Sequence, residues 1–202
     1  MNNVKSDIIK DINHWFDHLD LSEQNHTRLY RWDPNHSLPT LLKKLIDVLK
    51  IPNNQIKTLK VEHTQDYQTQ SPHSDTPMGQ TTVVIPLMCM EEIATFTFDA
   101  WYVGHNTRGF KYRPSGLTYY DGEWLSKDTD KLIGLTDEQF DRKMFDRWLW
   151  ELRYEDLHGL KIQKCFKWKV GEPISFPSNQ LHSGSSFKKF KRFCVIHHSS
   201  TA

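Results

Sequence analysis

Hydrophobic positions near the N-terminus recur at helical spacing. The first set begins at Val4 and ends at Leu19, and the second runs from Leu38 to Leu49. Apolar residues that recur every three or four positions form one face of an amphipathic helix. The pattern therefore predicts two amphipathic helices, which make an N-terminal helical layer over residues 1–52 before any strand.

From about residue 55 the pattern changes to short runs of β-branched and aromatic residues, separated by Pro, Gly, Asn or Asp. Such runs predict strands. The predicted strands cover residues 56–63, 81–88, 94–103, 116–120, 165–170, 173–176 and 192–197. Many short strands favour a sandwich or barrel of antiparallel sheets. We expect one domain over residues 1–202, with its β core at 55–198.

One stretch inside the β region has helical spacing instead. Hydrophobic residues from Phe140 to Leu152 lie on one helical face, with the sequence Thr-Asp-Glu-Gln at 136–139 as a capping box and Gly159 behind. This predicts an inserted helix near 137–157, of about five turns. The fold class expected from the pattern is mainly β with flanking helices (α+β).

Composition narrows the classes of function. The 202 residues are 37% hydrophobic and 12% aromatic, enough for one real core. Lys plus Arg number 26 against 25 for Asp plus Glu, so the net charge of +1 supplies no field for a phosphate backbone or an anionic membrane. We expect neither nucleic acid nor membrane as a partner.

The three cysteines form no CxxC pair, which argues against a disulfide framework and a structural zinc site. The N-terminal residues show no signal-peptide pattern. A cytoplasmic location is expected.

A candidate metal site begins at His73-Ser74-Asp75. Strand residues two apart point to the same side of a sheet, so an imidazole and a carboxylate at this spacing can reach one ion. The same spacing at residues 18–20 continues the first helix, where residues two apart point in different directions. For residues 73–75 alone, a loop aspartate beside a solvated histidine is an equally good interpretation.

The surroundings favour a metal. His73 and Asp75 stand just before a predicted strand, and about a hundred residues later a turn, a short strand and a second turn lead to His182. Two histidines and one carboxylate on one face of an octahedron suit oxygen-activating non-haem Fe(II). Ten positions after His182 comes Arg192, and an arginine in a buried strand needs an anionic partner.

The order HxD, long interval, His and then Arg resembles the Fe(II)- and 2-oxoglutarate-dependent dioxygenase superfamily, over residues 67–198. The resemblance implies a double-stranded β-helix (jelly roll, cupin-like) in which His73, Asp75 and His182 hold Fe(II) and form the catalytic centre. It implies that Arg192 binds the distal carboxylate of 2-oxoglutarate and that Tyr67 contacts the same cosubstrate. An ordinary strand tyrosine is the competing interpretation of residue 67.

The sequence departs from the family pattern near the cosubstrate anchor. The position two residues after Arg192, often serine in the family, is Cys194, and Lys189 and Lys191 stand close enough that one of them could bind the cosubstrate instead. Arg192 is preferred because a guanidinium binds a carboxylate through two parallel hydrogen bonds, whereas a lysine acts as a point charge.

The resemblance implies an enzyme that uses Fe(II), 2-oxoglutarate and O2 to hydroxylate a C–H bond of a small-molecule or peptide substrate, with release of succinate and CO2. Two alternatives remain open: a cupin-like metalloprotein that does not use 2-oxoglutarate, and a non-catalytic β-sandwich binding module. The pair His197-His198 is not counted among the ligands, because neighbours on a strand point to opposite faces. A structural or solvated role is expected for both.

Overall fold

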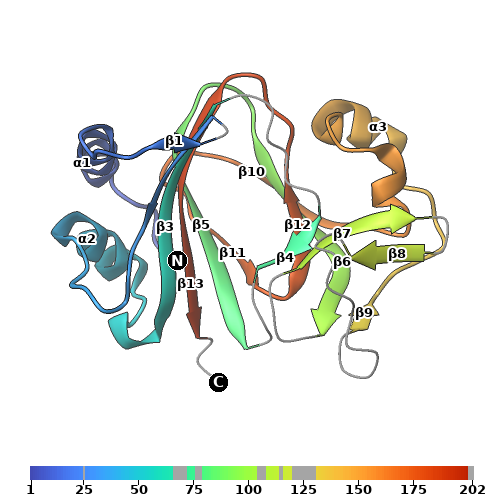
Figure 1. The fold of residues 1–202 in the computed structure, drawn as a ribbon, viewed down its shortest axis with the longest axis horizontal. Coiled ribbons are helices and arrows are strands. Elements are labelled where there is room, and N and C mark those ends of the chain that lie inside the picture. The colour runs from blue at the N-terminus through green and yellow to red at the C-terminus, as the bar shows by residue number, and fades with distance from the viewer. Residues whose placement is uncertain are drawn as a thin grey trace.

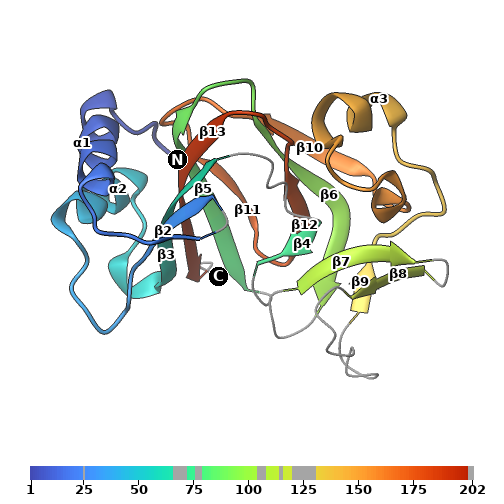
Figure 2. The ribbon, with the colours of Figure 1, turned by 45° about the horizontal axis from the view of Figure 1, so that its top comes forward.

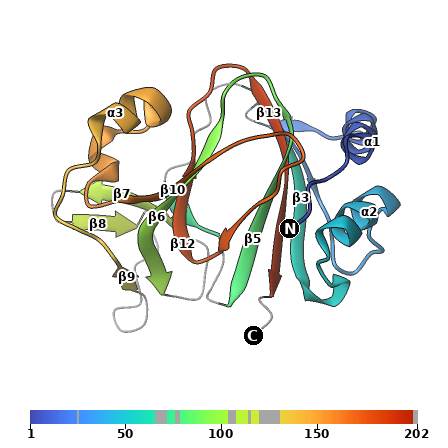
Figure 3. The same ribbon diagram turned by 180° about the vertical axis from the view of Figure 1, so that it is seen from behind.

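The computed structural model describes residues 1–24, 26–65, 72–75, 79–103, 108–113, 116–119 and 131–199. Two antiparallel sheets lie opposite each other, with helices on the outer side of each (Figure 1). The view from behind shows the same layers, with α1 and α2 outside one sheet and α3 outside the other (Figure 3).

Along the chain, two helices and two short strands precede the long strands of the sheets. The elements are α1 (Ser6–Asp17), β1 (Glu23–Gln24), β2 (Thr27–Arg31), α2 (Thr40–Leu49), η1 (Asn53–Gln55), β3 (Ile56–Gln65), β4 (His73–Ser74), β5 (Gln80–Cys89), β6 (Ala94–Val103), β7 (Arg108–Arg113), β8 (Gly116–Tyr119), β9 (Lys131–Ile133), α3 (Arg142–Met144), η2 (Phe145–Leu149), η3 (Tyr154–Leu157), β10 (Ile162–Lys167), β11 (Ile174–Pro177), β12 (Gln180–Gly184) and β13 (Phe190–Ser199).

The first sheet has the strand order β1-β2-β3-β13-β5-β11, and the second has the order β10-β6-β12-β4-β7-β8, with β9 also paired to β6. Several neighbouring strands are far apart in sequence: β13 lies between β3 and β5, and β4 lies beside β12 (Figure 2). This arrangement is a double-stranded β-helix of the jelly-roll, cupin-like type, as the sequence predicts.

The core has three layers because strand side chains alternate between faces. On β5, Val83 and Ile85 pack under α1 and α2, whereas Val84 packs between the two sheets. On β13, Ile196 belongs to the helix-covered layer and Val195 to the interior. A third cluster packs the second sheet against the segment that contains α3; its largest members include Phe96, Phe98, Tyr102 and Trp148.

Two predictions about local structure are wrong. Strands do precede the second helix, because β1 and β2 lie between α1 and α2 and add to the edge of the first sheet. The inserted helix is also much shorter than 137–157: Asp141 caps it by accepting hydrogen bonds from the backbone N–H groups of Lys143 and Met144, so it starts only at Arg142. It then widens into the π-helical turn η2 and is followed by the separate 3-10 turn η3.

The remaining sequence expectations concern cysteines and membranes. All three cysteines are free thiols in the structure. Within the described residues, no helix combines the length and the apolar character that crossing a bilayer requires.

Candidate metal centre

The pairing of β4 with β12 brings His73 and His182 together. The two residues are direct cross-strand partners, and their ring centroids lie 4.3 Å apart. Asp75 follows β4, where its backbone N–H donates to the carbonyl oxygen of Ser178 over 2.9 Å. One ligand atom from each of His73, Asp75 and His182 lies within 4.8 Å of the other two. The structure therefore brings together the three residues that the sequence singles out as ligands.

The donor atoms of these three residues lie near one another. His73 Nε2 lies 3.5 Å from Asp75 Oδ1, and His182 Nε2 lies 3.2 Å from Asp75 Oδ2. His182 Nδ1 lies 3.0 Å from the carbonyl oxygen of Gln180, which can only accept, so Nδ1 carries the proton. The lone pair of His182 is thus on Nε2 and points to the cluster, a tautomer typical of metal-binding histidines.

The carboxylate of Asp75 is held in its ionised form. Burial acts to raise the pKa of Asp75, but the neighbouring imidazoles of His182, His197 and His73 hold this pKa well below its usual range. Thr82 also donates a hydrogen bond to Asp75 Oδ2 over 3.0 Å. An anionic oxygen beside two imidazole nitrogens is a donor set for Fe(II) and related divalent metals, so the residues fit the ion that the resemblance implies.

Arg192 is not part of this cluster, and its predicted role as cosubstrate anchor does not fit its position. Its guanidinium donates to Asp17 Oδ1 over 2.6 Å and to the backbone carbonyl of Asn13 over 3.2 Å, and it lies 4.6 Å above the ring of Phe16. All three partners belong to α1, which covers the outer face of the first sheet. The side chain points outward because it shares a face of β13 with Cys194 and Ile196.

Lys191, one residue earlier on β13, points into the space between the sheets. Its Nζ lies 4.2 Å from the ring centroid of Phe187 and 5.7 Å from that of Trp168. It also lies 3.5 Å from the point that a Cβ on Gly184 would occupy. Gly184 is two residues beyond His182 on β12, and therefore on the same face. Of the alternative anchors that the sequence offers, Lys191 is the one on the interior side.

The ammonium group of Lys191 is strongly desolvated. Burial lowers the pKa of Lys191 to about 8, although the carboxylates of Glu62 and Glu151 act to raise it. Among the residues that the structure describes, none forms a hydrogen bond or an ion pair with Nζ. The interior thus contains a buried cation surrounded by aromatic rings.

His197 is the site residue that sequence reasoning missed. Its Nε2 lies 3.2 Å from Asp75 Oδ2, and its Nδ1 lies 2.5 Å from Thr58 Oγ1. The rule that neighbouring strand residues face opposite ways holds, because His198 is on the other face. The sequence did not show which of the two histidines faces inward. Lys191 and His197 are an even number of residues apart on β13, so they share the interior face.

Tyr67, the other predicted cosubstrate contact, lies outside the described residues.

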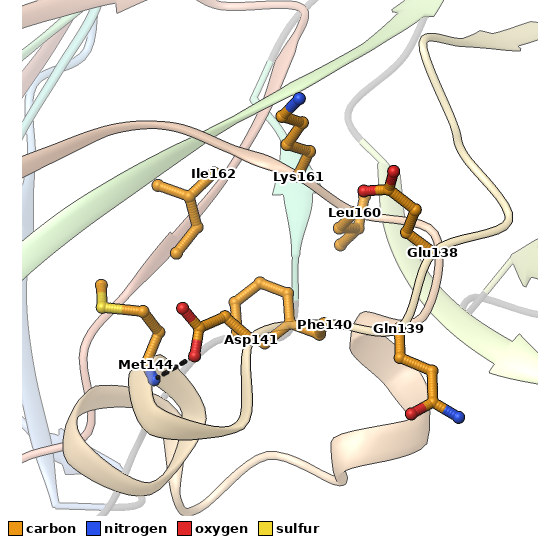
Figure 4. Close-up of a pocket in the computed structure, with 8 residues that line it drawn as sticks. All are labelled: Glu138, Gln139, Phe140, Asp141, Met144, Leu160, Lys161 and Ile162. Atoms are coloured by element: carbon orange, nitrogen blue, oxygen red, sulfur yellow. Dashed lines mark hydrogen bonds between the residues drawn. The ribbon is translucent and has the colours of Figure 1, made fainter.

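A separate surface pocket of about 420 Å³ lies between α3 and β10 (Figure 4). Phe140, Met144, Leu160 and Ile162 supply apolar walls, and Asp141 faces it while capping α3. None of its lining residues belongs to the metal centre, so this pocket has no part in chemistry at the metal.

Comparison with known proteins adds information about the fold. No family model and no curated protein matches this sequence. Among solved structures, HygX from Streptomyces hygroscopicus, with nickel and 2-oxoglutarate bound, is similar over 98% of this chain and 80% of its own, at 10% identity and a TM-score of 0.50. The ycfD protein of E. coli matches over 93% of this chain and 37% of its own, at 12% identity and a TM-score of 0.41.

A recombinant oxalate oxidase in complex with glycolate matches over 88% of this chain and 53% of its own, at 11% identity and a TM-score of 0.36. Of these three structures, HygX has the TM-score that supports an argument, and at 10% identity that argument concerns the fold alone. The chain is therefore a cupin-like double-stranded β-helix, similar in fold to HygX, with a His-Asp-His candidate metal site inside it.

Proposed function

We propose that this protein is an Fe(II)- and 2-oxoglutarate-dependent oxygenase that hydroxylates a C–H bond of a small-molecule or peptide substrate. In the balanced reaction, the substrate C–H, O2 and 2-oxoglutarate give the C–OH product, succinate and CO2. Bound Fe(II) would supply the redox chemistry that couples the reduction of O2 to the decarboxylation. His73, Asp75 and His182 would hold the ion and leave the opposite positions open.

The observation that carries this proposal is the buried ammonium group of Lys191. A buried cation without an anionic partner is costly, so the fold retains it at a cost to stability unless a ligand supplies the anion. The residue beside it, Gly184, is two positions from His182, which corresponds to roughly 6.6 Å along a strand. A five-carbon dicarboxylate can span such an interval, with one end at the metal ligands and the other at Lys191.

The surroundings favour a short, flat and anionic ligand. Gly184 has no side chain and leaves room next to Lys191 Nζ. The ring of Phe176 packs 4.6 Å from that of His182, and Val84 and Val195 continue the apolar wall. Apolar walls exclude water and strengthen the attraction between the ammonium and a carboxylate. The binding of nickel and 2-oxoglutarate by HygX, a protein of similar fold, supports the same ligand chemistry.

An anaerobic titration tests the proposal. Metal-free protein is titrated first with Fe(II) and then with 2-oxoglutarate, and the weak visible charge-transfer band of a chelated Fe(II)–oxoacid complex is followed. We expect the band to appear and to saturate at one equivalent of each component. Binding of iron without the band would support a cupin-like metalloprotein that does not use 2-oxoglutarate. Absence of iron binding would support a non-catalytic binding module.

A further inference from the structure

A row of three side chains crosses the inner face of the first sheet at the metal centre. Thr58 on β3, His197 on β13 and Thr82 on β5 are cross-strand partners in register. Two members of the row approach the same atom, because Thr82 Oγ1 lies 3.0 Å and His197 Nε2 lies 3.2 Å from Asp75 Oδ2. The third member, Thr58, contacts the other ring nitrogen of His197.

His197 lies next to the predicted ligands but is not one of them. Two atoms bound to one metal at about 2.1 Å are at most about 4.2 Å apart. Among the described residues, the donor atoms that all lie within 4.8 Å of one another belong to His73, Asp75 and His182, and this group does not include His197. As placed, His197 can act on a metal only through Asp75.

The Nε2 atom of His197 needs an acceptor. The residue is only 8% exposed, and within the described part of the chain Nε2 has no partner with hydrogen-bond geometry, although Asp75 Oδ2 is close. A buried polar nitrogen without a partner is unfavourable. Asp75 Oδ2, which also accepts a hydrogen bond from Thr82, lies 3.2 Å from His197 Nε2 and is an acceptor for its proton. His182 does not donate to this oxygen, because its proton is on Nδ1.

We propose that His197 is a positioning residue for the metal ligand Asp75, to which it donates a hydrogen bond from Nε2–H to Oδ2 in the metal-loaded protein. In this tautomer Nδ1 accepts a hydrogen bond from the hydroxyl of Thr58. The inference rests on the metal-binding part of the proposed function and does not depend on 2-oxoglutarate.

Binding of Co(II) to metal-free protein, followed by visible absorption without cosubstrate, tests this role. His197→Leu removes the donor, and we expect the affinity for Co(II) to fall by about 10- to 100-fold, as for other residues that orient metal ligands. His197→Gln places an amide N–H near the position of Nε2 and should recover most of the affinity. Once saturated, all variants should show the wild-type absorption bands, because the ligands are unchanged.

Two further variants separate this role from a structural one. His198→Leu changes the neighbouring histidine, which is on the opposite face of β13, and should bind Co(II) like the wild type. Thr58→Val removes the hydroxyl that fixes the tautomer, at an exposed position where the fold tolerates change, and should weaken Co(II) binding less than His197→Leu. Far-ultraviolet circular dichroism checks that each variant is folded.

Three results would overturn the inference. If His197→Leu binds Co(II) with wild-type affinity, the hydrogen bond has no effect on the metal, while the metal site itself stands. If saturated His197→Leu and His197→Gln share altered absorption bands, His197 is a ligand. If the wild-type protein binds no Co(II), the metal site and the role of His197 are both wrong. A failure of 2-oxoglutarate binding alone leaves the inference untouched.

Discussion

Lys191 and Arg192 are adjacent on β13, yet their charged groups lie on opposite faces of the first sheet. The ammonium of Lys191 is between the sheets among aromatic rings, and the guanidinium of Arg192 is paired with Asp17 on α1. Both side chains are buried, but only the cation of Arg192 has an ion-pair partner among the described residues. The two positions should therefore respond differently to the loss of charge.

Lys191→Met should weaken 2-oxoglutarate binding without changing the affinity for Fe(II). A hydrogen bond to a charged group contributes about 1.5–3 kcal/mol, so its loss corresponds to roughly 10- to 100-fold in the dissociation constant. The measurement is the anaerobic titration of the Fe(II)-loaded variant with 2-oxoglutarate. An unchanged dissociation constant would show that Lys191 is not the anchor.

Arg192→Met should lower stability and leave 2-oxoglutarate binding unchanged. The substitution keeps an apolar chain over Phe16 but removes the hydrogen bonds to Asp17 and Asn13. Because Asp17 is half exposed and can be rehydrated, we expect a loss of about 1–3 kcal/mol in the free energy of unfolding. Urea denaturation measures it. A large loss of cosubstrate affinity in a folded Arg192→Met protein would restore the anchor role to Arg192.

The pH dependence of stability should reveal the buried ammonium. The pKa of Lys191 is about 8 in the folded protein, against 10.5 for the ordinary group, so the unfolded chain holds the proton more tightly. The resulting destabilisation, on the order of 3 kcal/mol, is fully present below pH 8 and is relieved as the pH rises from 8 to 10.5. Metal-free Lys191→Met should thus be more stable than wild type at pH 7, by a margin that shrinks towards pH 10.5. Equal stability at about pH 7 would argue against a desolvated cation.

His182→Ala should abolish stoichiometric iron binding while the fold survives. The variant loses a ligand, and the two remaining ligands, His73 and Asp75, hold a divalent ion poorly. Elemental analysis after reconstitution measures the iron, and circular dichroism measures the fold. An iron-replete and active His182→Ala protein would rule out the ligand assignment.

Enlarging the side chain at Gly184 tests whether 2-oxoglutarate binds next to Lys191. A Cβ at this position would lie 3.5 Å from Lys191 Nζ, an ordinary contact, so Gly184→Ala should fold and bind 2-oxoglutarate with modest loss. Gly184→Leu should fill the space next to the ammonium and exclude the cosubstrate, with metal binding retained. Comparing the Fe(II) and 2-oxoglutarate titrations of the two variants separates the sites. Full 2-oxoglutarate affinity in Gly184→Leu would place the carboxylate elsewhere.

Much of the fold, and the residues that meet in the candidate metal centre, could be predicted from the sequence. Short runs of β-branched and aromatic residues separated by turn residues indicated the β core, and the spacing of His73 and Asp75 before a strand indicated two candidate ligands on one face. The length of the inserted helix was harder to predict from the sequence. Hydrophobic residues at helical spacing from Phe140 to Leu152 are compatible with one long helix and also with several short helical turns. The helix starts at Arg142 because the side chain of Asp141 caps its first turn. This local contact competes with the capping box that the sequence predicts at residues 136–139.

The sequence by itself determined the kind of sheet and the order of the candidate ligands, since period and spacing are properties of the chain. Only the tertiary structure decided which face of β13 is the interior. This strand lies between β3 and β5 and is covered on one side by helices and on the other by the second sheet. A strand buried on both faces shows no polar side in its sequence, and a shift of one residue exchanges the faces. The choice between Lys191 and Arg192, and the place of His197 beside Asp75, therefore depended on packing.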